Sequence, residues 1–464
     1  MWRPAAPPWW AAALVVAAVA VVWRLAFSLR APPFVTNDSL SYLLPGFDLA
    51  HGLGFDPALK RPPGYPLFIA GAMALGGEEL RSVMLLQHLL GAATAVMAMA
   101  LGWTLFGRVA GAIAGLATAL SGPLVVMEHY VMSETLFTVF LVLAVLLYAR
   151  LLEGGRGWLA VSVGLAIGLA ALTRPIGQSV AVLLALGLLA PRGPSLGQRA
   201  RQAGLLLAGC ALVVLPWMVR NLAVHGTFAL ATGLGEGLAV RTIRYEQRFD
   251  VPEAPEGDRQ AARARRIYRE EARDGSAFDL ARRFRDELSL SEAAADRAMR
   301  DVALAAIWTR PDYYVAGSLD MAWRTFAGRP VRLRQDWQPW RNINWPPRVA
   351  RLLPQPSPVE DRQFGQAEWL ATAFDPARFP WAMLALAAAG TVAGLWRGRL
   401  LVGVLAVLVT VLVLVGGFLI GIEWRYRYPL DPLINVLAAG GAAAIVSRVP
   451  ALATRLRPPQ PSRA

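Results

Sequence analysis

Ten long apolar segments constrain the fold of this chain more than any other feature of its sequence. Each is close to the length that an α-helix needs to cross the ~30 Å hydrocarbon core of a bilayer. The composition agrees, because 56% of the residues are hydrophobic and only 17% are charged. We therefore predict an all-α polytopic membrane protein with about ten transmembrane helices. The segments are 9–28, 80–106, 108–126, 133–151, 158–173, 176–190, 202–219, 379–396, 400–422 and 430–447.

The net charge of the chain does not require a nucleic-acid partner, and its cysteine content does not allow a disulfide framework. The net charge of +14 comes almost entirely from arginine, since Lys60 is the only lysine. Part of this charge occupies short loops between apolar segments, where the positive-inside bias explains it without nucleic acid. The single cysteine, Cys210, can form no internal disulfide. The first apolar segment lacks a small-residue cleavage site, so we expect an uncleaved anchor.

Arginines in the short loops and the tail predict the orientation. With ten spans they all fall on one side of the membrane, and the positive-inside rule makes that side the cytoplasm. The N-terminus then lies inside, whereas the first loop and residues 226–378 lie outside. We therefore expect a multi-pass protein of the bacterial plasma (inner) membrane, with an active site that faces the periplasm or exterior. The arginines are Arg150, Arg156, Arg192, Arg199, Arg201, Arg397, Arg399, Arg448, Arg455 and Arg457.

Composition divides the chain into three parts. Residues 1–225 form an N-terminal transmembrane module that includes the first external loop. Residues 226–378 are rich in Arg, Glu and Asp with apolar residues at helical spacing, as expected for an external, mainly helical segment. Residues 379–464 form a C-terminal transmembrane module. A solvated helical cap without chemistry is an equally good interpretation of the external segment.

The first external loop, Asn37 to Phe68, places one carboxylate and two cations on one face of the membrane. Asp38 follows the first predicted span, and Lys60 and Arg61 precede a double proline. Two successive prolines force extended backbone and would hold Arg61 in place. The apolar run 67–75 is too short to span, so we expect an interfacial helix there. Asp38 is our candidate catalytic base, and Lys60 and Arg61 are candidate ligands of a phosphate.

Glu128 and Glu134 form a candidate second acidic site near the outer surface. Glu134 follows a serine and could simply begin a helix, where unpaired N–H groups and the helix dipole favour a carboxylate. The functional alternative is that these carboxylates bind an acceptor hydroxyl or amine. A further alternative is that Asp38 and Glu134 share a divalent cation. The sequence leaves these interpretations open.

Three further arginines lie where topology does not explain them. Arg174 stands between two spans separated by almost nothing, where a charge is costly unless it snorkels or meets an anion. Arg425 and Arg427 cluster at an external helix end, and we favour anion coordination there over an internal salt bridge. All three are therefore candidate ligands of a phosphate, and a structural ion pair is an alternative role for Arg174.

Six short motifs occur in order along the chain: Asn37-Asp38-Ser39 with Tyr42, Arg61-Pro62-Pro63 with Tyr65, Ser133-Glu134-Thr135-Leu136-Phe137, Leu172-Thr173-Arg174-Pro175, Pro216-Trp217 with Arg220-Asn221, and Arg425-Tyr426-Arg427 with Pro429. Their order and common outward placement resemble those of the polytopic GT-C glycosyltransferases. The resemblance is strongest to the bacterial relatives of protein O-mannosyltransferases and lipid A aminoarabinose transferases. It extends over most of the chain.

This resemblance implies a GT-C-like helix arrangement and a hexosyl- or pentosyltransferase that uses a polyprenyl-phosphate-linked sugar donor at the outer leaflet. It also implies inversion at the anomeric carbon and an acceptor that is a lipid, a glycan or a protein. The first loop contains a lone Asp38, whereas several subfamilies contain an adjacent acidic pair. Dependence on a divalent cation therefore stays open.

The residues suit this chemistry on independent grounds. A sugar phosphate ester leaves as an anion, so fixed cations such as Arg61 and Arg425 would stabilise the charge that develops. Asp38 would take the acceptor proton while the anomeric carbon is attacked from the face opposite the phosphate. One alternative function is a transporter or flippase of a lipid-linked or anionic substrate, although matched broken helices and internal repeats are not evident. A membrane scaffold is a second alternative, but a scaffold needs no such convergence of charges.

Overall fold

The computed structural model describes residues 8–191, 193–245, 249–275, 277, 279–329, 331, 333, 345–353, 361–421 and 424–448. Helices dominate these ranges, where the pairing of extended backbone is limited to one isolated bridge between Phe34 and Tyr130. The predicted all-α fold is therefore confirmed. Arg192, Arg455 and Arg457 of the predicted cytoplasmic loops lie outside the described residues.

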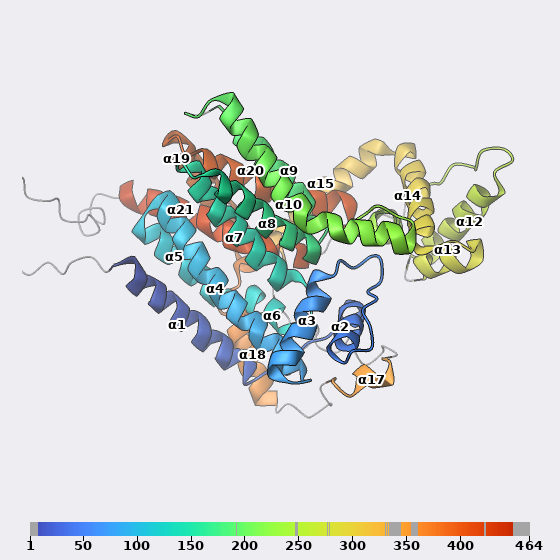
Figure 1. The fold of residues 1–464 in the computed structure, drawn as a ribbon, viewed down its shortest axis with the longest axis horizontal. Helices are drawn as coiled ribbons and strands as arrows, with labels where there is room; N and C mark the ends of the chain where they lie inside the picture. The colour runs from blue at the N-terminus through green and yellow to red at the C-terminus, as the bar shows by residue number, and fades with distance from the viewer. Residues whose placement is uncertain are drawn as a thin grey trace, which may run out of the picture.

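The helices follow one another along the chain as coloured in Figure 1. The first group is α1 (Trp9–Ser28), α2 (Asn37–Ala50), α3 (Gly64–Gly76), α4 (Leu80–Phe106), α5 (Arg108–Leu120), α6 (Gly122–His129), α7 (Glu134–Leu152), α8 (Gly157–Thr173), α9 (Gly177–Leu189) and α10 (Leu196–His225). The second group is α11 (Leu234–Val240), the π-helical η1 (Arg241–Tyr245), α12 (Arg259–Asp274), α13 (Leu280–Leu288), α14 (Glu292–Thr309), α15 (Pro311–Ala327), α17 (Pro347–Ala350) and α18 (Asp361–Thr372). The last group is η3 (Pro376–Arg378), α19 (Pro380–Trp396), α20 (Leu400–Leu419), η4 (Trp424–Tyr426), η5 (Tyr428–Leu430) and α21 (Asp431–Arg448).

Six helices among the described residues are long and apolar enough to cross a membrane: α1, α4, α7, α10, α20 and the continuous stretch of η5 and α21. The bent pair of α5 and α6 is a seventh if it forms one span. Helices α8, α9 and α19 occupy other predicted spans, but at ~1.5 Å per residue they measure only about 26, 20 and 26 Å. The structure thus bears out a multi-pass membrane protein without confirming the count of ten.

Glycines let pairs of membrane helices pack backbone to backbone. A Cβ on Gly164 of α8 would lie 2.0 Å from the carbonyl oxygen of Leu206 in α10. In the C-terminal part, a Cβ on Gly390 of α19 would lie 1.9 Å from the carbonyl oxygen of Leu437 in α21. No side chain fits at these distances, so small residues set how closely each pair approaches.

A break after α5 directs the chain into the centre of the protein. Helices α5 and α6 meet at Ser121 with a bend of 45°. Directly after α6, Tyr130 forms the parallel bridge with Phe34. Asp38 lies four residues after Phe34, in the first turn of α2. Glu134 lies four residues after Tyr130, in the first turn of α7. The bridge therefore holds two acidic helix starts close together.

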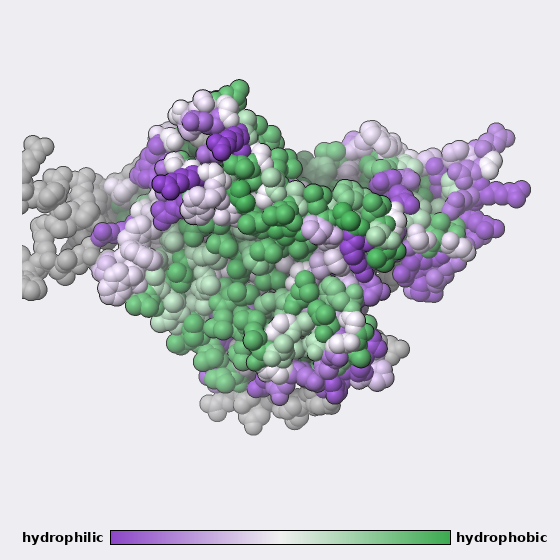
Figure 2. Space-filling view, in the orientation of Figure 1, coloured by the Kyte–Doolittle hydropathy of each residue, from purple (hydrophilic) through white to green (hydrophobic). Residues whose placement is uncertain are grey.

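Helices α11 to α14 build a charged lobe at one end of the molecule (Figure 1). Its interior is a cluster of buried apolar side chains that includes Ile267, Tyr268 and Phe284. Figure 2 shows a largely hydrophilic surface on this lobe and a broad apolar surface over the membrane helices. Helix α11 packs against α14 and also contacts α20. The lobe therefore reaches the membrane bundle through α11.

The orientation inferred from the arginine loops predicts that this lobe lies outside the cell and the α7–α8 loop inside. A Glu253→Cys variant in a Cys210→Ala background should react with a membrane-impermeant maleimide in intact cells, because the Glu253 side chain is 87% exposed. The matched Glu153→Cys variant, whose native side chain is 50% exposed, should react only after permeabilisation. The reverse labelling pattern, measured by mass shift, would show that the orientation is inverted.

Candidate active site

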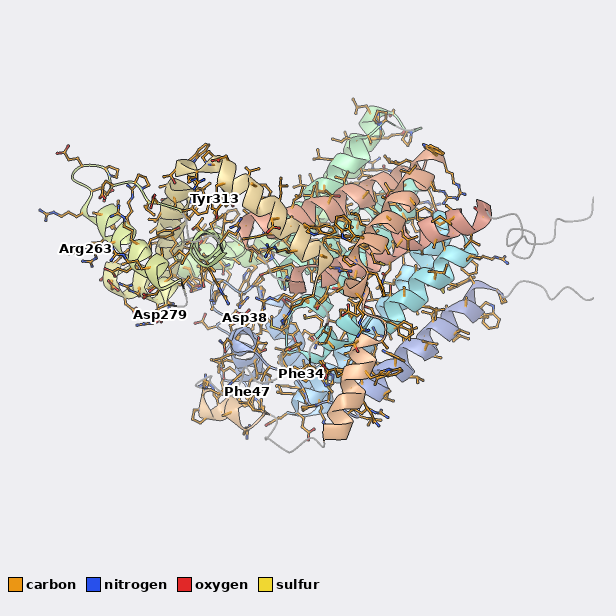
Figure 3. All side chains as sticks on the ribbon, turned by 180° about the vertical axis from the view of Figure 1, so that it is seen from behind. Phe34, Asp38, Phe47, Arg263, Asp279 and Tyr313 are labelled. Carbon is orange, nitrogen blue, oxygen red and sulfur yellow. The ribbon has the colours of Figure 1, made fainter. Side chains whose placement is uncertain are left out.

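One cavity collects most of the charged residues that the sequence singled out. Its volume is about 480 Å³, and residues of the first loop, α11 and α20 line it. In Figure 3, Asp38 and Phe47 lie on the same helix, α2, with Asp38 nearer to the lobe that carries Arg263 and Asp279. The charged lining residues are Asp38, Lys60, Arg61, Arg174, Glu236, Arg244 and Arg425, and the apolar ones include Phe137, Ile176, Val240, Leu412, Val415, Leu419 and Ile420.

Asp38 bridges two arginines that are far apart in the sequence. Its Oδ1 accepts a hydrogen bond from Arg61 Nη2 at 2.6 Å, and its Oδ2 accepts one from Arg425 Nη1 at 2.8 Å. Burial raises the pKa of Asp38, but the opposite charges of Arg61 and Arg425 outweigh this effect and hold the pKa well below its usual range. Asp38 is therefore ionised at physiological pH.

Helix α2 itself orients Arg61 toward Asp38. Arg61 Nε donates to Ser41 Oγ at 2.9 Å, and Arg61 Nη1 donates to the Tyr42 hydroxyl at 3.1 Å. The guanidinium also lies 4.6 Å from the centre of the Tyr42 ring, within the range of a cation–π contact. Positions 38, 41 and 42 share one face of a helix. A single helix thus presents the carboxylate together with the groups that hold its partner.

Glu134 and Arg174 form a second ion pair at the cavity. Arg174 Nη1 lies 2.6 Å from Glu134 Oε1, and Glu134 is buried. The Arg174 guanidinium lies 4.9 Å from the centre of the Tyr426 ring. Tyr42 and Ser133 connect the two ion pairs, because their hydroxyl oxygens lie 3.3 Å apart. Glu134 is thus a first-turn charge, as one interpretation predicted, and also the partner of a cavity arginine.

The two remaining predicted cations differ in their surroundings. Lys60 lines the cavity, and its Nζ lies 3.7 Å from Glu236 Oε2 of α11. Arg427 is buried and stands apart from the cavity lining. Arg427 Nε donates to Asp431 Oδ1 at 2.8 Å, and Nη1 donates to the Ala327 carbonyl oxygen at 3.0 Å. Arg427 therefore forms an internal salt bridge, which the sequence left as the alternative to anion coordination.

Glu128 is buried inside the bundle instead of lying near the outer surface. Both of its carboxylate oxygens accept hydrogen bonds from Arg24 at 2.7 Å, and Oε2 also lies 2.8 Å from His88 Nδ1. A Cβ on Gly91 would lie 2.0 Å from Glu128 Oε1, so α4 makes room for the carboxylate with a glycine. Glu128 therefore links α1, α4 and α6, and it is absent from the cavity lining.

Three charged residues that line the cavity or support the bundle were not predicted from the sequence. Glu236 and Arg244 line the cavity from α11 and η1, but each is one of many charges in the external segment and neither belongs to a predicted motif. Arg24 lies inside the first apolar segment. An arginine there is costly without a partner, and that signal could have predicted a buried carboxylate opposite it.

The carboxylates of the site do not suit a shared divalent cation. Asp38 lies between two arginines and Glu134 is paired with Arg174, so arginine already balances the charge of each carboxylate. Within the part of the chain that the structure describes, no group of three or more His, Cys, Asp or Glu side chains is placed to hold a metal ion. The excess of arginine suits an anion instead.

Residues 60–219 match a family model described as dolichyl-phosphate-mannose-protein mannosyltransferase. Among solved structures, the archaeal oligosaccharyltransferase AglB from Archaeoglobus fulgidus, in complex with an inhibitory peptide and a dolichol-phosphate, has a TM-score of 0.51 at 13% identity, with 97% of this chain and 52% of that chain covered. The apo oligosaccharyltransferase of the same organism has a TM-score of 0.50 at 15% identity, with 96% and 51% covered. ArnT from Cupriavidus metallidurans, bound to undecaprenyl phosphate, has a TM-score of 0.41 at 16% identity, with 97% and 81% covered.

The chain spans about half the length of the oligosaccharyltransferases that it matches. No curated protein matches its sequence. At identities this low, the similarity to the oligosaccharyltransferases shows a shared fold.

Because Arg24 and Glu128 form a buried ion pair, we predict that the stability of the folded protein depends on both residues together. Glu128→Leu or Arg24→Met alone leaves a buried charge without its partner, and such changes cost about 3–5 kcal/mol. The double variant removes both charges and should recover most of this loss in thermal unfolding of the purified protein. Glu153→Leu, at an exposed pair with Arg150, is the control and should change stability by less than ~1 kcal/mol. A double variant no more stable than either single variant would contradict a compensating pair.

Proposed function

Since this chain has the fold of the GT-C glycosyltransferases, as its motifs predicted, we propose that it is a membrane glycosyltransferase. It transfers a sugar from a polyprenyl-phosphate-linked donor to a hydroxyl or amine of a lipid, a glycan or a protein. The observation that carries this proposal is the Asp38 carboxylate held between Arg61 and Arg425 in a cavity with apolar walls.

Positive charge exceeds negative charge around the cavity, which suits a phosphate. A donor phosphodiester carries one negative charge, and it gains a second when its bond to the sugar breaks. Arg61 and Arg425 would hold the phosphate where this charge develops, so they would stabilise the transition state more than the bound donor. The lining residues comprise five cations against two carboxylates, namely Lys60, Arg61, Arg174, Arg244 and Arg425 against Asp38 and Glu236.

The apolar wall suits the prenyl chain of such a donor. Leu412, Val415 and Leu419 are spaced by three and four residues, so they share one face of α20, a helix that can span the membrane. A prenyl chain along this face would stay among apolar side chains and lipid while its phosphate reaches the arginines. The AglB structure holds a dolichol-phosphate, which belongs to the same chemical class.

Asp38 is the proposed general base. It takes the proton of the acceptor hydroxyl or amine as that group attacks the anomeric carbon of the sugar. The attacking atom forms its new bond with its own electron pair, the bond from the anomeric carbon to the phosphate oxygen breaks, and polyprenyl phosphate leaves. Attack from the face opposite the phosphate inverts the anomeric centre.

Donor binding would also change the basicity of Asp38. In the free protein, Arg61 and Arg425 lower its pKa and so make it a weak base. A phosphate that shares these two arginines would weaken their effect on the carboxylate and raise the pKa of Asp38 toward its usual value. The base would therefore become stronger when the donor is in place.

We place the reaction at the external face of a bacterial inner membrane. The first loop, α11 and η1 supply five of the seven charged residues of the cavity, namely Asp38, Lys60, Arg61, Glu236 and Arg244. The orientation that we predict from the arginine-rich loops puts these elements outside.

Arg61→Lys and Arg425→Lys should each weaken the binding of undecaprenyl phosphate by roughly 10- to 100-fold. Lysine keeps the charge but lacks the forked geometry of arginine, and a hydrogen bond to a charged group contributes about 1.5–3 kcal/mol. Titration in detergent, followed by intrinsic tryptophan fluorescence, measures the Kd. Arg348→Lys, at a surface pair with Asp48, is the matched control and should bind like the wild type. Unchanged binding in both cavity variants would contradict the phosphate site.

Asp38→Asn should lower the rate of sugar transfer by ~100- to 10,000-fold, because asparagine matches the shape of aspartate but cannot take a proton. Binding of undecaprenyl phosphate should persist. The rate is measured as initial product formation in membranes of a deletion strain that expresses each variant, and mass spectrometry identifies the sugar and the acceptor. Asp48→Asn, at another carboxylate of α2, is the control. Near-normal transfer by Asp38→Asn at an equal protein level would refute its role as the base.

A further inference from the structure

We propose that Lys60 and Glu236 form a subsite that recognises two neighbouring hydroxyl groups of the transferred sugar. This proposal rests on the proposed function, because the sugar is the one that the donor phosphate carries. The two residues line the same cavity from different elements, Lys60 from the first loop and Glu236 from α11. The subsite gives Lys60 a different role from the phosphate ligand that the sequence predicts.

The Lys60–Glu236 pair is more widely separated than the other ion pairs at the cavity. Its Nζ and Oε2 atoms lie 3.7 Å apart, whereas the pairs of Asp38 and Glu134 with arginine measure 2.6–2.8 Å. A separation of 3.7 Å is too long for a hydrogen bond. Both side chains are partly exposed, at 40% and 33%. An ammonium has three donors and a carboxylate about four acceptor sites, so both groups can bind a ligand.

Helix α14 fixes the backbone of both residues. Glu292 Oε1 accepts a hydrogen bond from the Lys60 N–H at 3.1 Å, and Asp296 Oδ1 accepts one from the Glu236 N–H at 3.0 Å. A Cβ on Gly235 would lie 1.8 Å from the Asp296 carbonyl oxygen, so a glycine lets α11 contact α14 directly. The main chain, and not the ion pair, therefore positions the two side chains. They can separate to admit a ligand while the backbone stays in place.

A sugar ring with neighbouring hydroxyl groups matches this pair. Glu236 can accept a hydrogen bond from one hydroxyl while Lys60 donates one to the oxygen of the next. A few polar groups placed in this way fix the orientation of a ligand in its site. Because the charges of Lys60 and Glu236 cancel, the subsite suits a neutral sugar better than a second anion.

The subsite adjoins the place proposed for the phosphate. Lys60 directly precedes Arg61, and its charge contributes to the lowered pKa of Asp38. The ammonium of Lys60 thus lies within electrostatic reach of the proposed base. A sugar joined to a phosphate at Arg61 would therefore have Lys60 within reach. The competing interpretation is that the Lys60–Glu236 ion pair only connects the first loop to α11 and binds no ligand.

The test compares the binding of undecaprenyl phosphate with that of undecaprenyl phosphate that carries mannose, glucose, galactose or arabinose. The wild type should bind at least one sugar-bearing lipid ~10-fold more tightly than the bare lipid, the gain expected from one charge-assisted hydrogen bond. Glu236→Gln should abolish this difference, while the Kd of the bare lipid changes less than about twofold. Glu253→Gln, at an exposed carboxylate of the lobe, is the control and should behave like the wild type.

Each other outcome refutes a defined part of the scheme. If Glu236→Gln keeps the preference for the sugar, or weakens the binding of every lipid equally, the sugar subsite is refuted. The Lys60–Glu236 pair then only connects the first loop to α11. A wild type that binds the bare lipid but prefers no sugar-bearing lipid also refutes the subsite and leaves the phosphate site standing. A wild type that binds none of the lipids refutes the proposed function together with the subsite.

Lys60 permits an independent measurement because it is the only lysine in the chain. Acetylation with an amine-specific reagent, followed by mass spectrometry of the peptide that contains Lys60, reports on a single ε-amino group. At equal occupancy, the preferred sugar-bearing lipid should slow this acetylation more than the bare lipid does. Equal slowing by the two lipids would assign Lys60 to the phosphate instead of the sugar.

Discussion

The carboxylate of Asp38 holds together two cations that are supplied by opposite ends of the chain. Arg61 comes from the first loop, and Arg425 lies 387 residues beyond Asp38. Two guanidinium groups this close would repel each other, and the carboxylate between them offsets that repulsion. The same interaction prepares the site for an anion, because a bound phosphate would share the arginines with Asp38. This triad of charged residues therefore connects distant parts of the chain and also supplies the groups for the proposed chemistry.

A buried polar network places the acidic helix starts beside this triad. Arg24 pairs with Glu128 on α6, and His129 Nε2 lies 3.0 Å from the Ala31 carbonyl oxygen, just before the Phe34 bridge. Charges buried in an apolar bundle are stable only with their partners, so the network allows few arrangements of α1, α4 and α6. The bridge that follows α6 then brings α2 and α7 together. Burial of Glu128, which separates it from the cavity, gives it this positioning role.

Much of the fold could be predicted from the sequence because membrane helices form locally. An apolar run must satisfy its own backbone hydrogen bonds in lipid, so most predicted spans coincide with one helix. The predicted span 108–126 is instead broken at Ser121 between α5 and α6. The lengths of α8, α9 and α19 show the limit of this reasoning, since an apolar helix packed among others need not reach across the whole bilayer. Asp38, Arg61 and Arg425 were predictable candidates because outward charges beside helix ends need a reason.

By itself, the sequence determined the helices, the charges at their ends and the family resemblance, because each of these depends on residues that are near one another in the chain. Only the tertiary structure decided which charges meet. Arg425 and Arg427 are two residues apart, yet one lines the cavity and the other is buried against Asp431 and the Ala327 carbonyl. Glu236 enters the cavity only because α11 packs between α14 and α20. Ion pairs act over a few ångströms in space, and those distances depend on how the helices pack.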